Sequence, residues 1–376
     1  MKRRTAGLIS VAIAVGLVMV GLWPFAFRPS NRVNWLKDRA GLSFHPDGIA
    51  YEPEAADWSG GGSPDQPAAF TMELWLEPGH VPATDLFDIL TIDDGGFPPG
   101  IVLFQWRTEL SLRVRDRTSH SGFREAGPSG VLAGQTPRFI TITLAPSGMA
   151  FYSNGSLLKQ YPGFTVPSSQ LNGRLILGNA AEGKHPWAGN LFGLAIYNRA
   201  LVASEVAQHY AMWTNHLTEQ FAAEPGLAAL YRFDEGSGPW VNDSSTSRHR
   251  LLIPERYVAL RKRVLELPWA PDPIEWSDLD DIAINILGFM PLGFLVYRYR
   301  QLAKPDGRGW NVVWAVCAGA VISLAIELTQ IWLPNRTSSA TDLVTNALGT
   351  FLGALLARKL QSGTTPAVNA SEIKPG

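Results

Sequence analysis

The chain has 376 residues and a formal net charge of −1, and only 17% of its residues are charged. It is rich in tryptophan (13), glycine (36) and proline (27), a composition that predicts membrane segments joined to a β-rich soluble part. The balanced charge gives no support to a nucleic-acid partner, and none is expected. The single cysteine, Cys317, excludes an intrachain disulfide and a site built from several thiolates.

Residues 1–34 are predicted to form a cytoplasmic tip and a first transmembrane helix. Lys2, Arg3 and Arg4 precede an uncharged apolar run over residues 7–27, which is about the length that spans a bilayer. The alternative is a signal peptide, but the run is longer than an ordinary signal segment and ends without a small-residue cleavage site. We therefore expect an uncleaved anchor whose basic end lies in the cytoplasm.

Residues 42–215 are predicted to form one all-β domain. Short apolar or alternating segments, separated by Gly, Pro, Asn and Ser, predict its strands, and Ser204 opens one short helix. The strand segments are residues 70–78, 101–106, 110–117, 138–144, 148–158 and 173–179. A domain of this size fits one β-sandwich. Residues 216–280 are expected to be a connector, in which residues 227–238 either add a strand to the sandwich or belong to the connector itself.

Three further apolar stretches predict transmembrane helices at residues 282–297, 310–333 and 341–357. Basic residues gather between the first two stretches and just after the third. They are Arg298, Arg300, Lys304, Arg308, Arg358 and Lys359. By the positive-inside rule they predict a multi-pass protein of the inner membrane, with four spans, both termini in the cytoplasm and the β domain outside. Residues 361–376 are expected to be a disordered cytoplasmic tail.

The β domain contains two motifs of a known family. Residues 152–155 read Tyr-Ser-Asn-Gly, a hairpin turn in which Asn and Gly tolerate positive φ, and a glycine-initiated strand at residues 189–201 precedes the short helix. With these motifs in this order, residues 42–215 resemble the laminin-G-like, concanavalin A-like jelly-roll family. The resemblance implies binding of a glycan or a protein through loops at the rim of the sandwich, in some members with calcium.

Asp88, Asp93 and Asp94 are the candidate calcium ligands of this domain, because Ca²⁺ needs several oxygen ligands. The alternative is that they are turn residues, since Asp hydrogen-bonds its own backbone in turns. No other cofactor is expected.

Two further sets of residues bear on a glycan function. Trp75, Trp106 and Trp187 either stack on sugar rings or fill the core. Glu73 and Glu77 share one face of a strand, but nothing else marks them as the two placed carboxylates that a glycosidase requires. Hydrolysis of a glycan is therefore not expected.

Residues 281–357 contain three motifs of polar and small residues. They read Asn285-x5-Pro291-x-Gly293, Glu327-x-x-Gln330 and Asp342-x3-Asn346-x2-Gly349-x3-Gly353. Together they resemble the VanZ-like family of membrane proteins, which is named after a factor associated with resistance to the glycopeptide antibiotic teicoplanin and has no established reaction. The resemblance implies a cell-envelope protein. The expected fold class is therefore α+β multidomain, a four-helix transmembrane bundle with an inserted all-β jelly-roll sandwich.

Polar residues of this part are predicted to form one cluster that faces the outer leaflet and binds a ligand. They are Asn285, Glu327, Gln330, Arg336, Asp342 and Asn346. The predicted topology brings their helix ends together, and ionisable residues inside spans are costly and mark functional sites. A purely structural alternative is that Arg336 pairs with Asp342 while Gln330 and Asn346 link helices.

The remaining motif residues are assigned to helix packing. Gly349 and Gly353 lie four residues apart on one helical face, a spacing that lets a second helix approach closely, and Gly293 is assigned the same role. Pro291 is expected to produce a local kink.

The sequence is compatible with three alternative functions. In the preferred one the protein binds, in which case its partners are a glycan or envelope protein at the sandwich and a membrane lipid, lipid-linked precursor or glycopeptide-like headgroup at the cluster. In the second the protein is an enzyme, with Glu327 or Asp342 as acid or base and Arg336 clamping a phosphate. In the third the bundle only anchors a scaffold.

Overall fold

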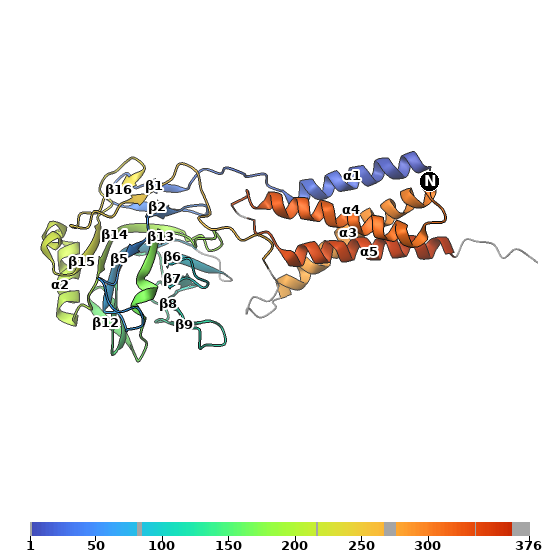
Figure 1. Cartoon of the computed structure of the whole chain (residues 1–376). Coiled ribbons are helices and arrows are strands. Elements are labelled where there is room, and N and C mark those ends of the chain that lie inside the picture. The colour runs from blue at the N-terminus through green and yellow to red at the C-terminus, as the bar shows by residue number, and fades with distance from the viewer. Residues whose placement is uncertain (1, 81–84, 216, 267–275, 335, 363–376) are drawn as a thin grey trace, which may run out of the picture. The chain divides into compact units, whose positions relative to one another are not determined.

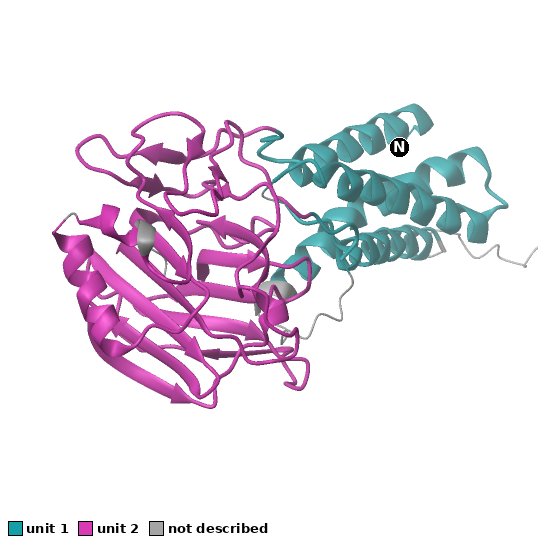
Figure 2. Ribbon diagram, turned by 60° about the vertical axis from the view of Figure 1, so that its left-hand side comes forward, with its two compact units in different colours: residues 1–27, 262–376 teal, residues 28–261 magenta. Residues whose placement is uncertain are grey.

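The computed structural model describes residues 2–80, 85–215, 217–266, 276–334 and 336–362. The chain divides into two compact units (Figure 2). The first, residues 1–27 with 262–376, is helical, and the second, residues 28–261, is a β-sandwich. The expected combination of a β-sandwich with membrane-type helices is confirmed.

The sandwich consists of two antiparallel sheets (Figure 1), with eight strands in the first and nine in the second among the described residues. The first sheet contains, in order of pairing, β1 (Val33–Trp35), β2 (Leu42–Phe44), β14 (Gly189–Tyr197), β5 (Phe70–Pro78), β10 (Arg138–Ala145), β11 (Gly148–Ser153) and β12 (Ser156–Pro162), with β15 (Leu227–Tyr231) also beside β14. The second contains β16 (Trp240–Val241), β17 (Leu251–Leu252), β3 (Ala50–Tyr51), β13 (Asn172–Leu177), β6 (Leu86–Asp93), β7 (Ile101–Trp106), β8 (Glu109–Arg115) and β9 (Phe123–Ala126), with β4 (Ala56–Asp57) beside β13.

The segment after the short helix adds strands to both sheets. β15 pairs antiparallel with β14, and β16 and β17 extend the edge of the second sheet beside β3. Of the two alternatives for residues 227–238, the structure therefore contains the one in which this segment contributes a strand to the sandwich.

Alternating side chains build the core between the sheets. Phe70, Met72, Leu74 and Leu76 of β5 are fully buried there, because every second residue of a strand points to the same face. A second buried cluster lies on the opposite face of the first sheet, where α2 (Ala203–Thr214) and the 3₁₀ segment η2 (Thr218–Ala223) cover β5, β10 and β14. The first sheet thus has a covered outer face.

The helical unit contains four helices long and apolar enough to cross a membrane, counted over the described residues. They are α1 (Arg3–Gly21), α3 (Trp276–Ala303), α4 (Arg308–Gln330) and α5 (Ala340–Ser362). α3 and α5 extend past the predicted stretches 282–297 and 341–357, because their polar first turns and basic last turns continue the helix beyond its apolar centre. Pro291 lies inside α3, which continues through it.

α3 and α5 approach each other at glycines. A Cβ at Gly349 would collide with the Ile286 carbonyl oxygen, and one at Gly353 with that of Met290. From the other helix, a Cβ at Gly293 would collide with the carbonyl oxygen of Thr350. The backbones therefore lie too close for any side chain at these positions, as small-residue spacing in membrane helices permits.

Candidate functional site

The predicted polar residues lie at one end of the helical unit. Glu327 and Gln330 occupy the last turn of α4, and Asp342 occupies the first turn of α5. Asn285 lies in the first half of α3, and Arg336 lies in the loop between α4 and α5. Segments of α3, α4 and α5 thus contribute to this end of the helical unit.

Glu327 is 1% exposed and holds the start of α5 in place. Its Oε2 atom accepts a hydrogen bond of 2.7 Å from the backbone N–H of Ser339. Ser339 in turn is the cap of α5, because its hydroxyl accepts a bond of 3.3 Å from the N–H of Asp342. The glutamate therefore fixes the α4–α5 loop at the point where the last helix begins.

Asp342 reaches toward α3. Its carboxylate hydrogen-bonds the side chains of Asn285 and Ser339, and Asp281 and Arg336 are its charged neighbours. In the described part of the chain the hydrogen-bond partners of Glu327 and Asp342 are uncharged. The centre of the cluster is therefore acidic and offers acceptors.

Arg336 and Gln330 face α1 instead. The guanidinium of Arg336 donates bonds of 2.9 and 3.3 Å to the carbonyl of Trp23, and Nε2 of Gln330 donates one of 2.8 Å to the carbonyl of Gly21. Gln330 therefore satisfies a carbonyl that the last turn of α1 leaves free, and Arg336 binds the segment just after that helix. The Arg336–Asp342 hydrogen-bonded pair of the structural alternative is not formed, whereas its helix-linking role for Gln330 is.

Asn346 lies one turn deeper than Asp342 and is 4% exposed. Its Nδ2 atom donates a 2.9 Å bond to the hydroxyl of Ser323 on α4, while its Oδ1 atom is buried without a hydrogen-bond partner among the described residues. Asn346 thus links α5 to α4 at the inner boundary of the cluster.

Lys262 is a member of this region that sequence reasoning missed. Its ammonium donates to the carbonyls of Leu333, Pro334 and Arg336 at 2.9, 2.5 and 2.8 Å, respectively. Nearby, the N–H of Glu266 donates to the carbonyl of Ser338, which ties the same loop to the preceding segment. No spacing rule connects a lysine in a connector with a loop some 70 positions later.

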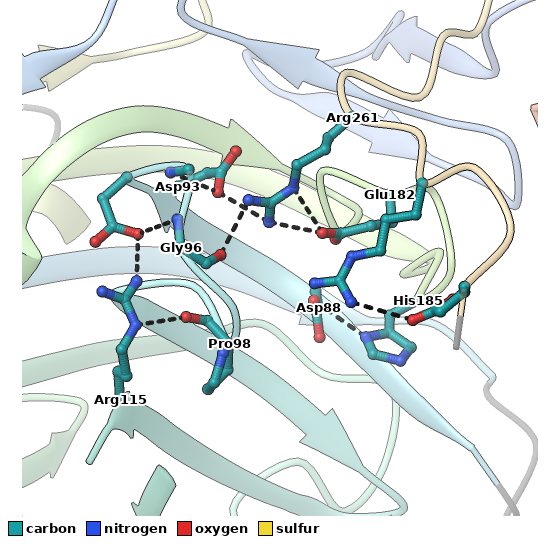
Figure 3. A network of polar contacts seen from close by, with 12 residues as sticks. Asp88, Asp93, Gly96, Pro98, Arg115, Glu182, His185 and Arg261 are labelled. Atoms are coloured by element: carbon teal, nitrogen blue, oxygen red, sulfur yellow. Dashed lines mark hydrogen bonds and ion pairs between the residues drawn. The ribbon is translucent and has the colours of Figure 1, made fainter. Parts of the chain in front are cut away.

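In the sandwich, the candidate calcium ligands do not converge (Figure 3). Asp88 faces His185 at 3.3 Å, Asp93 faces Arg261 at 3.2 Å, and Asp94 pairs with Arg115. Asp88 and Asp93 belong to β6, a strand that the sequence did not predict. The described residues contain no group of three or more His, Cys, Asp or Glu side chains placed to hold a metal ion.

Burial and these ion pairs together shift the pKa values of His185 and Asp93. Burial lowers the pKa of His185, but the Asp88 carboxylate outweighs it and leaves the pKa above its ordinary value. Burial also raises the pKa of Asp93, against the opposing effect of Arg261. The carboxylates therefore serve as ion-pair partners that fasten loops to the second sheet.

Comparison with known families matches both parts of the chain. Residues 228–361 match the family model VanZ/LLP1, and residues 56–207 match that of the concanavalin A-like lectin/glucanases superfamily. The chain combines a VanZ-like membrane part with a concanavalin A-like domain. Both resemblances seen in the sequence are confirmed. The VanZ match begins inside the sandwich, earlier than the motifs at residues 281–357.

Three solved structures show the likeness of the concanavalin A-like domain. The CBM40 module of the Ruminococcus gnavus IT-sialidase, bound to α2,3-sialyllactose, is 12% identical with a TM-score of 0.35, and 46% of this chain and 96% of that one are covered. A Bacteroides ovatus protein described as carbohydrate-binding is 13% identical with a TM-score of 0.40 and 57% coverage of each chain. The binding domain of Paraclostridial Mosquitocidal Protein 1 is 17% identical with a TM-score of 0.36, covering 50% of this chain and 47% of that one.

The chain spans about half the length of the last two of these structures. Among curated proteins, none matches the chain.

The two glutamates on β5 of the concanavalin A-like domain serve different neighbours. Glu73 is fully buried 3.0 Å from the ring of His209 on α2, and burial raises the pKa of this carboxyl. Glu77 accepts hydrogen bonds from Arg39 at 3.1 Å and from Asn190 at 3.0 Å. Glu73 is thus buried beneath α2, so Glu73 and Glu77 do not form the pair of accessible carboxylates that a glycosidase requires.

The three tryptophans considered from the sequence differ in exposure. Trp187 is fully buried and donates to Gln105, so it belongs to the core. Trp106 is 38% exposed beside the guanidinium of Arg107, which lies 4.9 Å from its ring centre. Trp75 is half-buried and lines a pocket on the outer face of the first sheet. Of these three tryptophans, Trp75 is the one whose ring can meet a ligand inside a pocket.

Proposed function

We propose that this protein binds a lipid-linked or glycopeptide-like headgroup at the Glu327–Asp342 cluster and an envelope glycan or protein through its sandwich. The observation that carries the first half is the acidic centre of the cluster, where two carboxylates from different helices have only uncharged hydrogen-bond partners among the described residues. Such carboxylates offer free acceptor capacity to amine and hydroxyl donors. Arg336, whose side chain is exposed, adds a cation beside them for a phosphate.

The charge distribution of the helical unit supports an outward orientation of this cluster. Arg3 donates to the hydroxyl of Tyr299, so the start of α1 lies beside the end of α3, and Figure 1 shows the α3–α4 turn at that same end. The basic residues Arg4, Arg298, Arg300, Lys304, Arg308, Arg358 and Lys359 belong to that end as well. By the positive-inside rule it faces the cytoplasm, which puts the cluster in the outer leaflet and the sandwich outside the inner membrane.

The proposed glycan binding rests on the match to a lectin and glucanase superfamily and on the half-buried Trp75, which lines a pocket of the sandwich. Because the membrane part is VanZ-like, we infer that occupancy of the cluster changes susceptibility to glycopeptide antibiotics such as teicoplanin.

An experiment with a labelled lipid distinguishes binding by this protein from catalysis. The purified full-length protein in nanodiscs is incubated with polyprenyl-diphosphate-linked precursors, and both the retained lipid and any released product are measured. Retention of unaltered lipid supports binding, whereas turnover that depends on Glu327 and Asp342 would replace it with the enzymatic alternative. Neither retention nor turnover of any precursor would contradict both.

A further inference from the structure

A small pocket opens on the outer face of the first sheet, beside α2. It has a volume of about 200 Å³ and is lined by aromatic and charged side chains. The lining residues are Arg39, Ala40, Trp75, Phe192, Trp213, Thr218, Arg232 and Asp234. Pockets for drug-sized ligands measure roughly 300–1,000 Å³, so this one admits a single ring with its substituents rather than a length of chain.

The aromatic wall of the pocket is rigid. Trp75 is held by Phe192 in an edge-on contact of 5.9 Å and 71°, and by Trp213 in another of 6.4 Å and 78°. Such T-shaped contacts are the preferred geometry of aromatic pairs. The half-buried ring of Trp75 is therefore already oriented, and a ligand that packs on it does not have to order it first.

The polar rim presents donors and acceptors side by side. Arg39 pairs with Glu77 at 3.1 Å, and its guanidinium lies 3.9 Å from the centre of the Phe192 ring. Arg232 pairs with Asp234 at 3.3 Å, and the Asp234 side chain is 48% exposed. A sugar hydroxyl both donates and accepts, so neighbouring hydroxyls fit a guanidinium held next to a carboxylate.

The same two ion pairs determine which ligand charge the rim of the pocket favours. Each arginine already has a carboxylate beside it, so the rim has no surplus positive charge to offer an acidic sugar. A neutral ring with hydroxyls at its edge and an apolar face fits both the rim and Trp75.

We propose that this pocket binds one neutral pyranose unit of a glycan, with the apolar face of the sugar against Trp75 and its hydroxyls on the Arg232–Asp234 pair. This proposal rests on the glycan binding proposed above. It adds where on the sandwich the glycan binds and which class of sugar is bound. The place is the α2 side of the sandwich.

The test uses the full-length protein in detergent and a panel of neutral hexose and N-acetylhexosamine oligosaccharides, with matched uronic-acid oligosaccharides. For the neutral probes, Trp75→Ala is expected to weaken binding by on the order of tenfold or more, as for loss of an aromatic anchor. Because Trp75 also packs against its neighbours, Asp234→Asn provides a second variant at an exposed position that leaves the fold intact. Trp106→Ala is the matched control, an exposed tryptophan outside the pocket, and is expected to bind as the unchanged protein does.

Loss of neutral-probe binding in both Trp75→Ala and Asp234→Asn, with binding kept in Trp106→Ala, would support the pocket. Binding that survives both pocket substitutions would overturn the pocket and leave the glycan function standing. A preference for the uronic-acid probes would overturn the neutral ligand class. If the unchanged protein binds none of the probes, that result contradicts both the proposed glycan binding and this pocket.

Discussion

Glu327 has both a structural and a proposed ligand-binding role, and the two can be separated by substitution. Its side chain accepts the N–H of Ser339, and a glutamine amide oxygen can accept the same bond, whereas alanine cannot. Glu327→Ala is therefore expected to leave a buried N–H unpaired and to lower the stability of the helical unit by about 1–3 kcal/mol relative to Glu327→Gln. Thermal unfolding in detergent measures this, and equal stabilities of the two variants would show that the bond does not hold the loop.

A second residue-scale prediction concerns the sandwich and pH. His249 contacts Glu52 at 2.6 Å, and this hydrogen bond raises the pKa of His249 above its usual value, against the lowering effect of burial. Because the folded pKa is raised, the stabilisation is fully present below the unfolded pKa of about 6.5 and is lost as the pH rises through the folded value. The Tm advantage of the unchanged protein over Glu52→Gln should therefore shrink from pH 6 toward alkaline pH. A difference that is constant with pH would contradict this.

At this scale the sequence predicted which residues lie near one another better than what they contact. Glu327, Gln330 and Asp342 were singled out because polar groups in apolar helices are costly, and the structure brings them to one end of the unit. The partners of Glu327 and Gln330 could not be predicted, because Ser339 and Gly21 offer them only backbone atoms, which carry no sequence signal.

The α3–α5 contact is the packing feature that the sequence predicted most directly. The spacing of Gly349 and Gly353 indicated a close helix approach, and carbonyl oxygens of α3 occupy the space where their side chains would be. Gly353→Leu should therefore force the helices apart and destabilise the unit by at least about 1–3 kcal/mol, the usual cost of overpacking. Ala347→Leu on the same helix is the control. Comparable Tm values for the two variants would show that α3 and α5 are not in close contact.

The loop between α4 and α5 supplies the next prediction. Lys262 binds three of its carbonyls, so Lys262→Met, which keeps the length of the side chain but not its donors, should free the loop. Hydrogen exchange at residues 336–340 is expected to accelerate while exchange in the middle of α4 stays unchanged. Unaltered exchange in the loop would show that Lys262 does not order it.

Elements with regular patterning were predictable, and those that depend on distant chain segments were not. β5, β7 and β10 have strict alternation or unbroken apolar runs, whereas β6 contains Asp88 and Asp93, which made it read as a turn. Residues 240–241 and 251–252 form two-residue strands that pair with each other, and the second of them also pairs with β3. Such short pairings depend on tertiary contacts, which local propensity does not contain.

At the scale of the whole molecule the main prediction is the topology. In a Cys317→Ser background, Ser63→Cys on the sandwich should react with a membrane-impermeant maleimide in intact cells. Gly309→Cys at the start of α4 should react only after the inner membrane is permeabilised. Both positions are exposed, so labelling reports the side of the membrane. The opposite pattern would place the basic end of the helices outside and the cluster in the inner leaflet.

The central claim is that the Glu327–Asp342 cluster holds a lipid headgroup, and native mass spectrometry of the purified full-length protein tests it most directly. The unchanged protein and Glu255→Gln, which alters a 91% exposed glutamate, are expected to retain the same envelope lipid. Glu327→Gln, which keeps the bond to Ser339, is expected to lose that lipid while remaining folded. Equal lipid retention by all three proteins, or no bound lipid in any of them, would contradict the account.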